Sequence, residues 1–253
     1  VDVVRHAGGV LEIPGESVTA PVALTLALAG AAIAAGAAVR VDAAVRGLRR
    51  DGDGLSVEAG DGTQVRARAV VNAAGLRADE VAALAGDGSF RIYPRKGEFL
   101  VFDPPDGAPL ERILLPVPSP TTKGVLVFPT LDGRITAGPT AHDQEDKGDW
   151  SVRAEGAAQV RAKLAERMPE LAAAEPVASY AGLRPAGAGV NYVIARSAAC
   201  PGLIHAAAIR STGLTAAPGI AERLCGLVAE LGVELGRSEE HTSELQSHHD
   251  VVC

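Results

Sequence analysis

Apolar and polar residues alternate with different periods along the first third of the chain. Pro21–Ala38 is an almost continuous run of apolar and small residues in which Pro21 suits a first helical turn, so a helix is predicted. Val39–Leu48 then predicts a β-strand. Turn sequences at Asp51–Gly54 and Asp61–Thr63 separate short alternating runs, which favours a small antiparallel meander.

A strand and a helix are predicted next. Arg68–Ala73 is nearly all apolar, as expected of a strand that is covered on both faces. It ends in Ala74 and Gly75, and a helix is predicted to begin near Arg77.

The composition changes near Phe90, where proline and aromatic residues become frequent and β-type runs dominate as far as Ala181. The predicted strands of this part are Gly97–Phe102, Gly124–Phe128 and Arg134–Ala137. One helix is predicted at Ser151–Met168, with Ser151 as its N-cap and Pro169 just beyond its end.

After Arg184 the strand–helix pattern returns. Leu203–Ile209 predicts a strand, Arg210–Gly213 a turn and Thr215–Leu231 a helix. The order predicts an α/β fold with an inserted, mainly antiparallel sheet domain. The predicted domains are residues 1–88 together with 185–236, and the inserted residues 89–184.

The last residues are expected to be foreign to the fold. Residues 237–247, RSEEHTSELQS, are a translation of codons that resemble a sequencing-library adapter, so residues 237–253 are predicted to be a non-native tail. His241, His248, His249 and Cys253 would otherwise suggest a metal-binding tail. As accidental codons they form no site, and no metal is predicted.

Composition and charge exclude some classes of function. The net charge of −7 and the lack of a Lys/Arg run argue against a nucleic-acid partner. The three cysteines form no CxxC pair and no even disulfide framework, which favours a reducing, cytoplasmic compartment. The uncharged stretch Ala20–Val39 is long enough to span a membrane, but its apolarity is mostly alanine. A small-residue helix packed under a sheet is favoured over a transmembrane segment.

Three segments carry a family resemblance. They are VVNAAGLRADEVAAL at 70–84, YAGLRPAG at 180–187 and AAIRSTGLTAAPGIAERL at 207–224. In this order they resemble a strand that ends at the cofactor, a GxRP element and the final flavin loop of FAD-dependent oxidoreductases of the D-amino-acid oxidase and glycerol-3-phosphate dehydrogenase type. The runs at 94–103 and 127–150 resemble the substrate-domain sheet, and are most similar to the glycerol-3-phosphate and L-2-hydroxyglutarate dehydrogenase branch.

The resemblance implies a partial FAD-binding, Rossmann-like domain and a mainly antiparallel β substrate domain. Members of the family open with a strand, a GxGxxG motif and a helix that hold the FAD pyrophosphate. No GxGxxG occurs here; Gly187 and Gly189 form a GxG, but Tyr192 stands where the third glycine belongs. Because the chain starts at Val1, we expect the missing segment upstream and expect the chain as written to hold FAD poorly.

The resemblance also implies a set of FAD contacts. Glycine lets the backbone approach a flat ring closely, and the N–H groups at the start of the last helix suit the pyrimidine edge of a flavin. An ordinary turn, a helix cap and tight packing of small residues are the alternatives. The implied contacts are Val45, Ala73, Ala74, Gly75, Arg210, Ser211, Thr212, Gly213, Leu214 and Thr215.

Arg184, in GLRP, is implied to bind the carboxylate or phosphate of the substrate, because its planar fork offers two parallel hydrogen bonds. Arg210 is predicted to be a second clamp or a structural ion-pair partner. Lys96 and Glu98 are weaker candidates for the catalytic base. Of the remaining histidines, His6, His142 and His205, the second is better explained as a solvated side chain and the third as a core residue.

The predicted function is transfer of a hydride to FAD from the carbinol carbon of a small anionic substrate, either glycerol 3-phosphate or a 2-hydroxy acid. An amino-acid oxidase or dehydrogenase of the same fold is one alternative, and an inactive, cofactor-free fragment is another. The electron acceptor, whether a quinone, oxygen or a redox partner, is not predicted. The expected location is cytoplasmic, with peripheral attachment to the inner membrane as the alternative.

Overall fold

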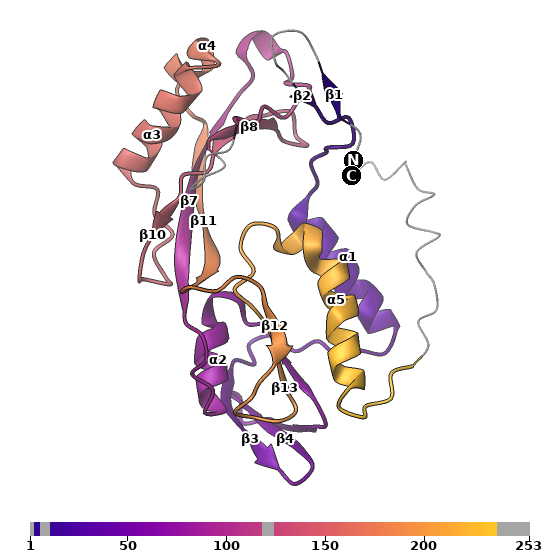
Figure 1. Ribbon diagram of the computed structural model, residues 1–253. Helices are drawn as coiled ribbons and strands as arrows, with labels where there is room; N and C mark the ends of the chain where they lie inside the picture. The colour runs from indigo at the N-terminus through magenta and orange to yellow at the C-terminus, as the bar shows by residue number, and fades with distance from the viewer. Residues whose placement is uncertain (1–2, 6–10, 118–123, 237–253) are drawn as a thin grey trace.

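The computed structural model describes residues 3–5, 11–117 and 124–236 (Figure 1). The predicted non-native tail, with its histidines and cysteine, lies outside the described residues. Two short strands, β1 (Val4–Arg5) and β2 (Leu11–Glu12), pair with each other near the start of the chain.

The largest sheet has five strands and is organised around β7 (Ile92–Phe102). Strand β11 (Ala178–Gly187) runs antiparallel along one edge of β7 from end to end. The opposite edge of β7 pairs first with β10 (His142–Asp143) and then with β9 (Ile135–Gly138), and β8 (Leu126–Pro129) lies beyond β9. The predicted antiparallel sheet is therefore present, and its central strand begins five residues earlier than position 97.

Two helices cover one face of this sheet. Helices α3 (Ala154–Ala165) and α4 (Pro169–Ala173) lie on one side of β7 and β11, while α1 (Pro21–Ala34) and α5 (Gly213–Ala229) lie on the other (Figure 1). The even-numbered residues of β7 from Lys96 to Phe102 lie on the side that α3 covers, because side chains alternate along a strand. The core that they form with α3, α4 and the neighbouring strands contains Leu100, Phe102, Val125, Val127, Ile135, Ala137, Val160, Leu164 and Leu171.

The predicted cap of the first of these helices is wrong. Helix α3 begins at Ala154 with Arg153 at its N-cap position, and no side chain caps it. The Ser151 hydroxyl instead donates to Oδ1 of Asp149 at 2.6 Å. Arg153 takes the N-cap position because its backbone N–H and side chain both bind the buried Glu98, which fixes the start of the helix by a tertiary contact.

A second, three-stranded sheet joins distant parts of the sequence. Strand β6 (Val70–Asn72) pairs in parallel with β13 (Leu203–Ala207), and β12 (Val193–Arg196) pairs antiparallel with β13. Helices α2 (Ala78–Leu84) and α5 (Gly213–Ala229) contact this sheet. Its core contains Ala78, Ala82, Phe90, Ile92, Ala207 and Ala208.

The predicted meander is a third sheet, made of β3 (Val45–Asp51), β4 (Gly54–Ala59) and β5 (Gln64–Ala67). Its first strand begins at Val45, six residues later than predicted. Leu48 and Leu55 of the meander pack on Cys200 and Leu203, which joins this sheet to β13.

Helix α1 (Pro21–Ala34) differs from its prediction. It was expected to pack under a sheet, but none of its residues is buried. Its large apolar side chains are exposed instead, with Val22 at 70 % and Leu26 at 66 %, because no other described element covers them. Among the described residues, no helix combines the length and apolarity that crossing a membrane requires.

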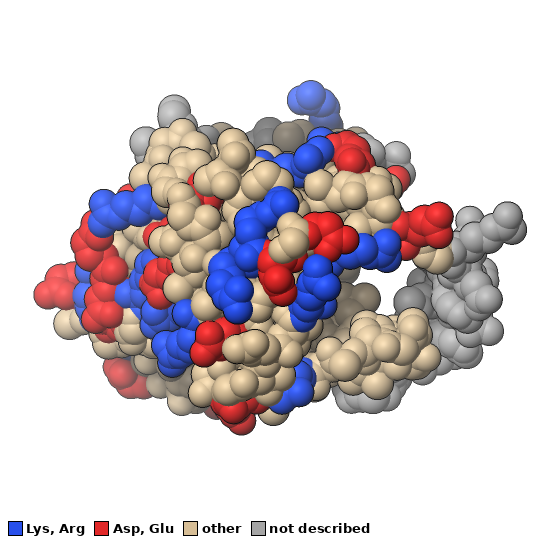
Figure 2. Space-filling model, turned by 90° about the horizontal axis from the view of Figure 1, so that it is seen from below, with Lys and Arg blue, Asp and Glu red and all other residues tan. Residues whose placement is uncertain are grey.

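Charges of both signs share the face of the molecule seen in Figure 2. Lys and Arg side chains alternate there with Asp and Glu side chains among the described residues. This face therefore presents no continuous basic surface of the kind that a polyanion binds.

These elements give the predicted fold class, an α/β arrangement with an inserted antiparallel sheet. The predicted domain boundaries at residues 88/89 and 184/185 stay a prediction. Strand β11 runs through the second of them without a break and pairs with β7 up to Gly187.

Candidate functional site

Two loops leave the same edge of the small sheet. Because β6 and β13 are parallel and Asn72 pairs with His205, the segments that follow the two strands emerge side by side. Nucleotides bind outside the carboxyl ends of parallel strands in α/β sheets. The implied FAD contacts 73–75 and 210–215 are thus brought to one edge, although more than 130 residues separate them.

The first loop is open and built from small residues. Ala73 and Ala74 are exposed, and Gly75 has a φ of +56° with nothing within 4 Å of the position of a Cβ atom. Glycine adopts this left-handed conformation without strain. The loop therefore leaves room for a flat group to approach the backbone, which fits the predicted cofactor.

The second loop ends at the start of α5. Thr212 occupies the N-cap position without a side-chain cap, and its hydroxyl bonds to that of Tyr192. The N–H of Ala216 donates to the Thr212 carbonyl at 2.9 Å. Among the described residues, the N–H groups of Leu214 and Thr215 have no such partner, so they remain available to electron-rich atoms. Ser211 is exposed at the same loop.

Val45 lies at the start of β3, where it is half-buried and pairs with Ala59. Its assignment as an adenine contact stays a prediction.

Arg184 lies on the face of the large sheet that α3 does not cover. It pairs with Arg95, so both side chains are on the odd-numbered face of β7. Its Nε donates to the Arg95 carbonyl at 3.0 Å, and its Nη2 donates to the carbonyls of Lys96 at 3.1 Å and Thr140 at 2.8 Å. Among the described residues, Nη1 makes no hydrogen bond, so its two N–H groups remain for a ligand. The predicted pair of parallel hydrogen bonds is not free, because Nε and Nη2 already donate to carbonyls.

Like charges surround Arg184. Burial lowers the pKa of its guanidinium, the positive charges of Arg95 and Arg210 lower it further, and Asp143 partly opposes them. Arg95 is paired with Asp143, whose Oδ1 lies 3.5 Å from Nε, and Nε of Arg210 donates to Oδ1 of Asn191 at 3.3 Å. Three guanidinium groups and one carboxylate leave an excess of two positive charges, which suits an anionic ligand. Arg95 was not among the predicted site residues.

A pair of glycines and then a pair of aromatic rings come next along this face. Gly97 and Gly182 pair with each other, and no atom lies within 4 Å of a Cβ placed on Gly182. One step further, the rings of Phe99 and Tyr180 stack with their centroids 4.7 Å apart and 12° between their planes. Arg184 is thus followed along this face by an open position at Gly182 and then by a flat aromatic surface.

Lys96 and Glu98 lie on the opposite face, under α3. Lys96 pairs with Leu183, is 0 % exposed, and donates from Nζ to Oδ2 of Asp149 at 2.6 Å and to the Ser151 carbonyl at 3.1 Å. The structure therefore does not bring Lys96 to the arginine cluster, and its side chain is committed to anchoring the segment before α3.

Glu98 is equally unsuited to act as a base. Burial raises the pKa of its carboxyl, but hydrogen bonds and charge from Arg153 and a hydrogen bond from Thr140 lower it more, to about 2. A carboxylate with so low a pKa is a weak proton acceptor near neutral pH.

The two histidines have other partners. His142 meets Oε1 of Gln159 through Nε2 at 2.9 Å. His205 is buried, with Nε2 3.0 Å from Oδ2 of Asp87 and Nδ1 3.3 Å from Nδ2 of Asn72. Its interpretation as a core histidine fits this burial.

Asn72 connects His205 to the predicted cofactor loop. It donates from Nδ2 to the Ala78 carbonyl at 2.7 Å and accepts from the Ala74 N–H through Oδ1 at 3.2 Å. The turn that follows β6 is therefore fixed by hydrogen bonds to the Asn72 side chain. This network was missed because Asp87 and His205 lie far apart in the sequence.

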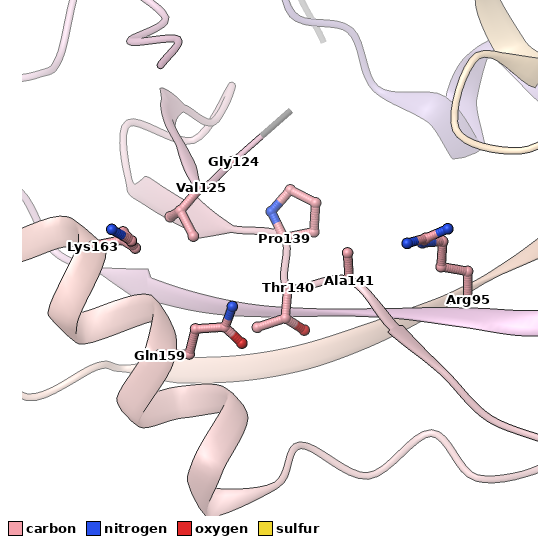
Figure 3. A pocket seen from close by; sticks show the side chains of 8 residues that line it. All are labelled: Arg95, Gly124, Val125, Pro139, Thr140, Ala141, Gln159 and Lys163. Atoms are coloured by element: carbon pink, nitrogen blue, oxygen red, sulfur yellow. The ribbon is translucent and has the colours of Figure 1, made fainter. Parts of the chain in front are cut away.

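A cavity of about 250 Å³ lies beside the arginine cluster. Arg95 and Lys163 stand at its opposite ends, with Pro139 and Thr140 between them (Figure 3). Its other lining residues are Gly124, Val125, Ala141 and Gln159. Neither Arg184 nor the two loops after β6 and β13 line this cavity. The candidate site is therefore assigned to the arginine cluster and not to the cavity.

The chain is similar to known flavoenzymes. A glycerol 3-phosphate dehydrogenase of Caloramator mitchellensis is 29% identical over 170 residues, which are 67% of this chain and 35% of that protein. The FAD-bound L-α-glycerophosphate oxidase of Mycoplasma pneumoniae superposes with a TM-score of 0.70 at 25% identity, over 78% of this chain and 52% of that one. The glycine oxidase of Geobacillus kaustophilus gives 0.65 at 28% identity, over 82% and 53%.

The chain therefore spans between about a third and about a half of the length of these relatives. The model of the FAD dependent oxidoreductase (DAO) family matches residues 2–227, which is most of the sequence. Together with the paired loops of the small sheet, this match shows that the chain belongs to the DAO family of FAD dependent oxidoreductases.

Proposed function

We propose that this chain carries the substrate-anion site and part of the cofactor site of an enzyme that oxidises the carbinol carbon of glycerol 3-phosphate. The observation that carries the proposal is the arginine cluster around Arg184, with its excess of two positive charges and an unoccupied Nη1. A phosphate monoester carries about −1.5 to −2 charges at pH 7 and balances that excess. A 2-hydroxy acid with two carboxylates has a similar charge and is the second member of the substrate class.

FAD, when bound, supplies the acceptor for the hydride. Ala73–Gly75 would hold it by close backbone approach, and the N–H groups of Leu214 and Thr215 would face the electron-rich edge of the flavin. Val45 would contact the adenine.

Arg184 would bind and orient the substrate through Nη1, while Arg95 and Arg210 add positive charge. The stacked pair Phe99 and Tyr180 would lie beyond Gly182 and keep water from that side. No side chain is proposed as the base, since Lys96 and Glu98 lie on the other face.

An amine substrate is the second candidate, because a glycine oxidase is among the similar structures. A substrate ammonium group needs an acidic partner. Asp143, the carboxylate that acts on Arg184, is already paired with Arg95. The excess of positive charge therefore favours the phosphate ester over an amino acid.

Isothermal titration calorimetry on the purified chain tests this proposal, with glycerol 3-phosphate, 2-hydroxyglutarate and glycine as ligands. We expect glycerol 3-phosphate to bind most tightly. Arg184→Ala should weaken it by about thirtyfold or more, because removing one partner of a partly buried charge pair costs about 2–5 kcal/mol. Arg184→Lys should recover only part, since an ammonium cannot keep the carbonyl contacts of Nε and Nη2 and also place a further nitrogen toward the ligand.

Arg40→Ala is the matched control, because Arg40 is exposed and pairs with Asp61 on the meander. It should leave the affinity unchanged. Wild-type affinity in Arg184→Ala would refute the assignment of Arg184, and tighter binding of glycine than of glycerol 3-phosphate would transfer the proposal to amine substrates.

A further inference from the structure

Thr140 is fixed to Glu98 by three hydrogen bonds. Its N–H donates to the Glu98 carbonyl at 3.2 Å, its hydroxyl oxygen accepts from the Glu98 N–H at 3.0 Å, and its hydroxyl donates to Oε2 of Glu98 at 2.7 Å. Thr140 is only 1% exposed. Its backbone and side chain therefore have little freedom as long as Glu98 stays in place.

Glu98 is itself fixed by the start of α3. Arg153 donates to Oε1 of Glu98 from its backbone N–H at 2.9 Å and from Nε at 3.0 Å, and to Oε2 from Nη2 at 3.2 Å. Gly156 lies so close that an added Cβ would be 2.0 Å from Oε2. The carboxylate is therefore held between the helix and the strand.

Arg184 meets this assembly from the other face of the sheet. Its side chain crosses β7 over Gly97, where an added Cβ would lie 3.1 Å from Nη2, and reaches the Thr140 carbonyl at 2.8 Å. Thr140 thus accepts from Arg184 with its carbonyl and donates to Glu98 with its hydroxyl. It is the link between the substrate face and the helix-covered face.

We propose that Thr140 is a positioning residue for the substrate anion, acting through Arg184; the inference rests on the proposed function. A guanidinium group is planar, so fixing Nε and Nη2 fixes the direction of Nη1. The Glu98–Thr140 pair holds the carbonyl that fixes Nη2. Because these hydrogen bonds of Arg184 go to neutral carbonyls, no carboxylate is bonded directly to its guanidinium, and its positive charge stays available to the ligand.

Binding of glycerol 3-phosphate to the purified chain tests the inference. Thr140→Val keeps the shape of the side chain but removes the hydroxyl, and should weaken binding by about five- to tenfold. Thr140→Ser restores the hydroxyl and should stay within about twofold of wild type. In an Arg184→Lys background, Thr140→Val should change the affinity by less than about twofold, because the group on which it acts is gone.

Ser197→Ala is the control for an effect that comes from lost stability alone. It breaks a different buried contact, that of Ser197 with Asp87, and should lower the melting temperature without changing the affinity. A second measurement uses the wild-type chain itself. The side-chain ¹⁵N signals of Arg184 should show slow rotation about the Nε–Cζ bond, and rapid averaging of these signals would overturn the inference even if Thr140→Val does not fold.

Two binding results also overturn the inference while leaving the proposed function intact. One is wild-type affinity in Thr140→Val together with weak binding in Arg184→Ala. The other is an equal loss from Thr140→Val in the wild-type and Arg184→Lys backgrounds. If Arg184→Ala itself binds normally, the proposed function fails first, which separates the two claims.

Discussion

Arg184 donates from Nη2 to the carbonyl oxygen of Lys96 at 3.1 Å, yet the side chains of these two residues lie on opposite faces of one sheet. The alternation of β7 therefore sorts the residues of PRKGEF into two groups. Arg95 and Gly97 lie on the face of the proposed anion site, whereas Lys96 and Glu98 anchor the segment that leads into α3.

Gly97 and Gly182 are neighbours in register but should respond differently to alanine. A Cβ on Gly97 would lie 2.8 Å from Cβ of Pro139 and 3.1 Å from Nη2 of Arg184, whereas a Cβ on Gly182 meets nothing within 4 Å. Gly97→Ala should lower the free energy of unfolding by about 1–3 kcal/mol. Gly182→Ala should leave it unchanged or raise it slightly. Urea unfolding measures both, and equal effects would contradict the close approach at Gly97.

Gly156 and Gly226 are helical glycines with opposite expectations. Alanine normally stabilises a helix interior by about 1 kcal/mol relative to glycine, and Gly226→Ala in α5 should show this gain. Gly156→Ala should instead lose about 2 kcal/mol, because its methyl group displaces the Glu98 carboxylate from its hydrogen bonds. Thermal melts of the two variants are compared with wild type. A gain in Gly156→Ala would mean that Glu98 moves freely.

Asp87 should contribute far more to stability than an exposed aspartate. It accepts from Ser89 N–H at 2.9 Å and contacts His205 and Ser197, all with its own side chain 3% exposed. Asp87→Ala leaves these groups without a partner and should cost about 3 kcal/mol or more. Asp61→Ala breaks only the exposed pair with Arg40 and should cost less than about 1 kcal/mol. Denaturant unfolding of the two variants distinguishes them by the shift of the midpoint, provided that the dependence of the unfolding free energy on denaturant stays constant.

Glu98 should make stability depend on pH in the acid range. In the folded chain the pKa of Glu98 is about 2, which is below the ordinary value of 4.5. Between these two pH values, Glu98 therefore binds fewer protons in the folded chain than in the unfolded chain. Its stabilisation is complete above about pH 4.5 and is lost as the pH falls toward 2. The difference in unfolding free energy between wild type and Glu98→Gln should therefore be largest near pH 6 and shrink at pH 3. A constant difference would show that Glu98 titrates normally.

The sequence predicted the elements whose signals are local. The apolar run before Ala73 and the small residues after it marked a buried strand and an open loop, and both are present. The fold class, the family and its FAD cofactor were predicted from the order of such segments, and the comparisons confirm them.

Features that depend on tertiary contacts were not predictable. The strand in PRKGEF was predicted to start at Gly97, so the faces of Lys96 and Arg95 were not distinguished. Lysine is rarely fully buried, so Lys96 was a candidate for the site and not for an anchor under α3. Ser151 was predicted as a cap because serine is common there, but Glu98 sets the start of α3 through Arg153. The roles of Arg184, Arg210 and the flavin-loop residues stay predictions.

The parallel pairing of β6 with β13 also constrains the order in which the chain folds. Val70 meets Leu203 across the sheet, so the strand that ends at the first cofactor loop gains this neighbour only after the whole inserted sheet has been synthesised. Closing so long a loop is slow compared with forming the β3–β5 hairpins. On a ribosome, the large sheet around β7 is therefore available to fold first, and the two halves of the cofactor edge meet last.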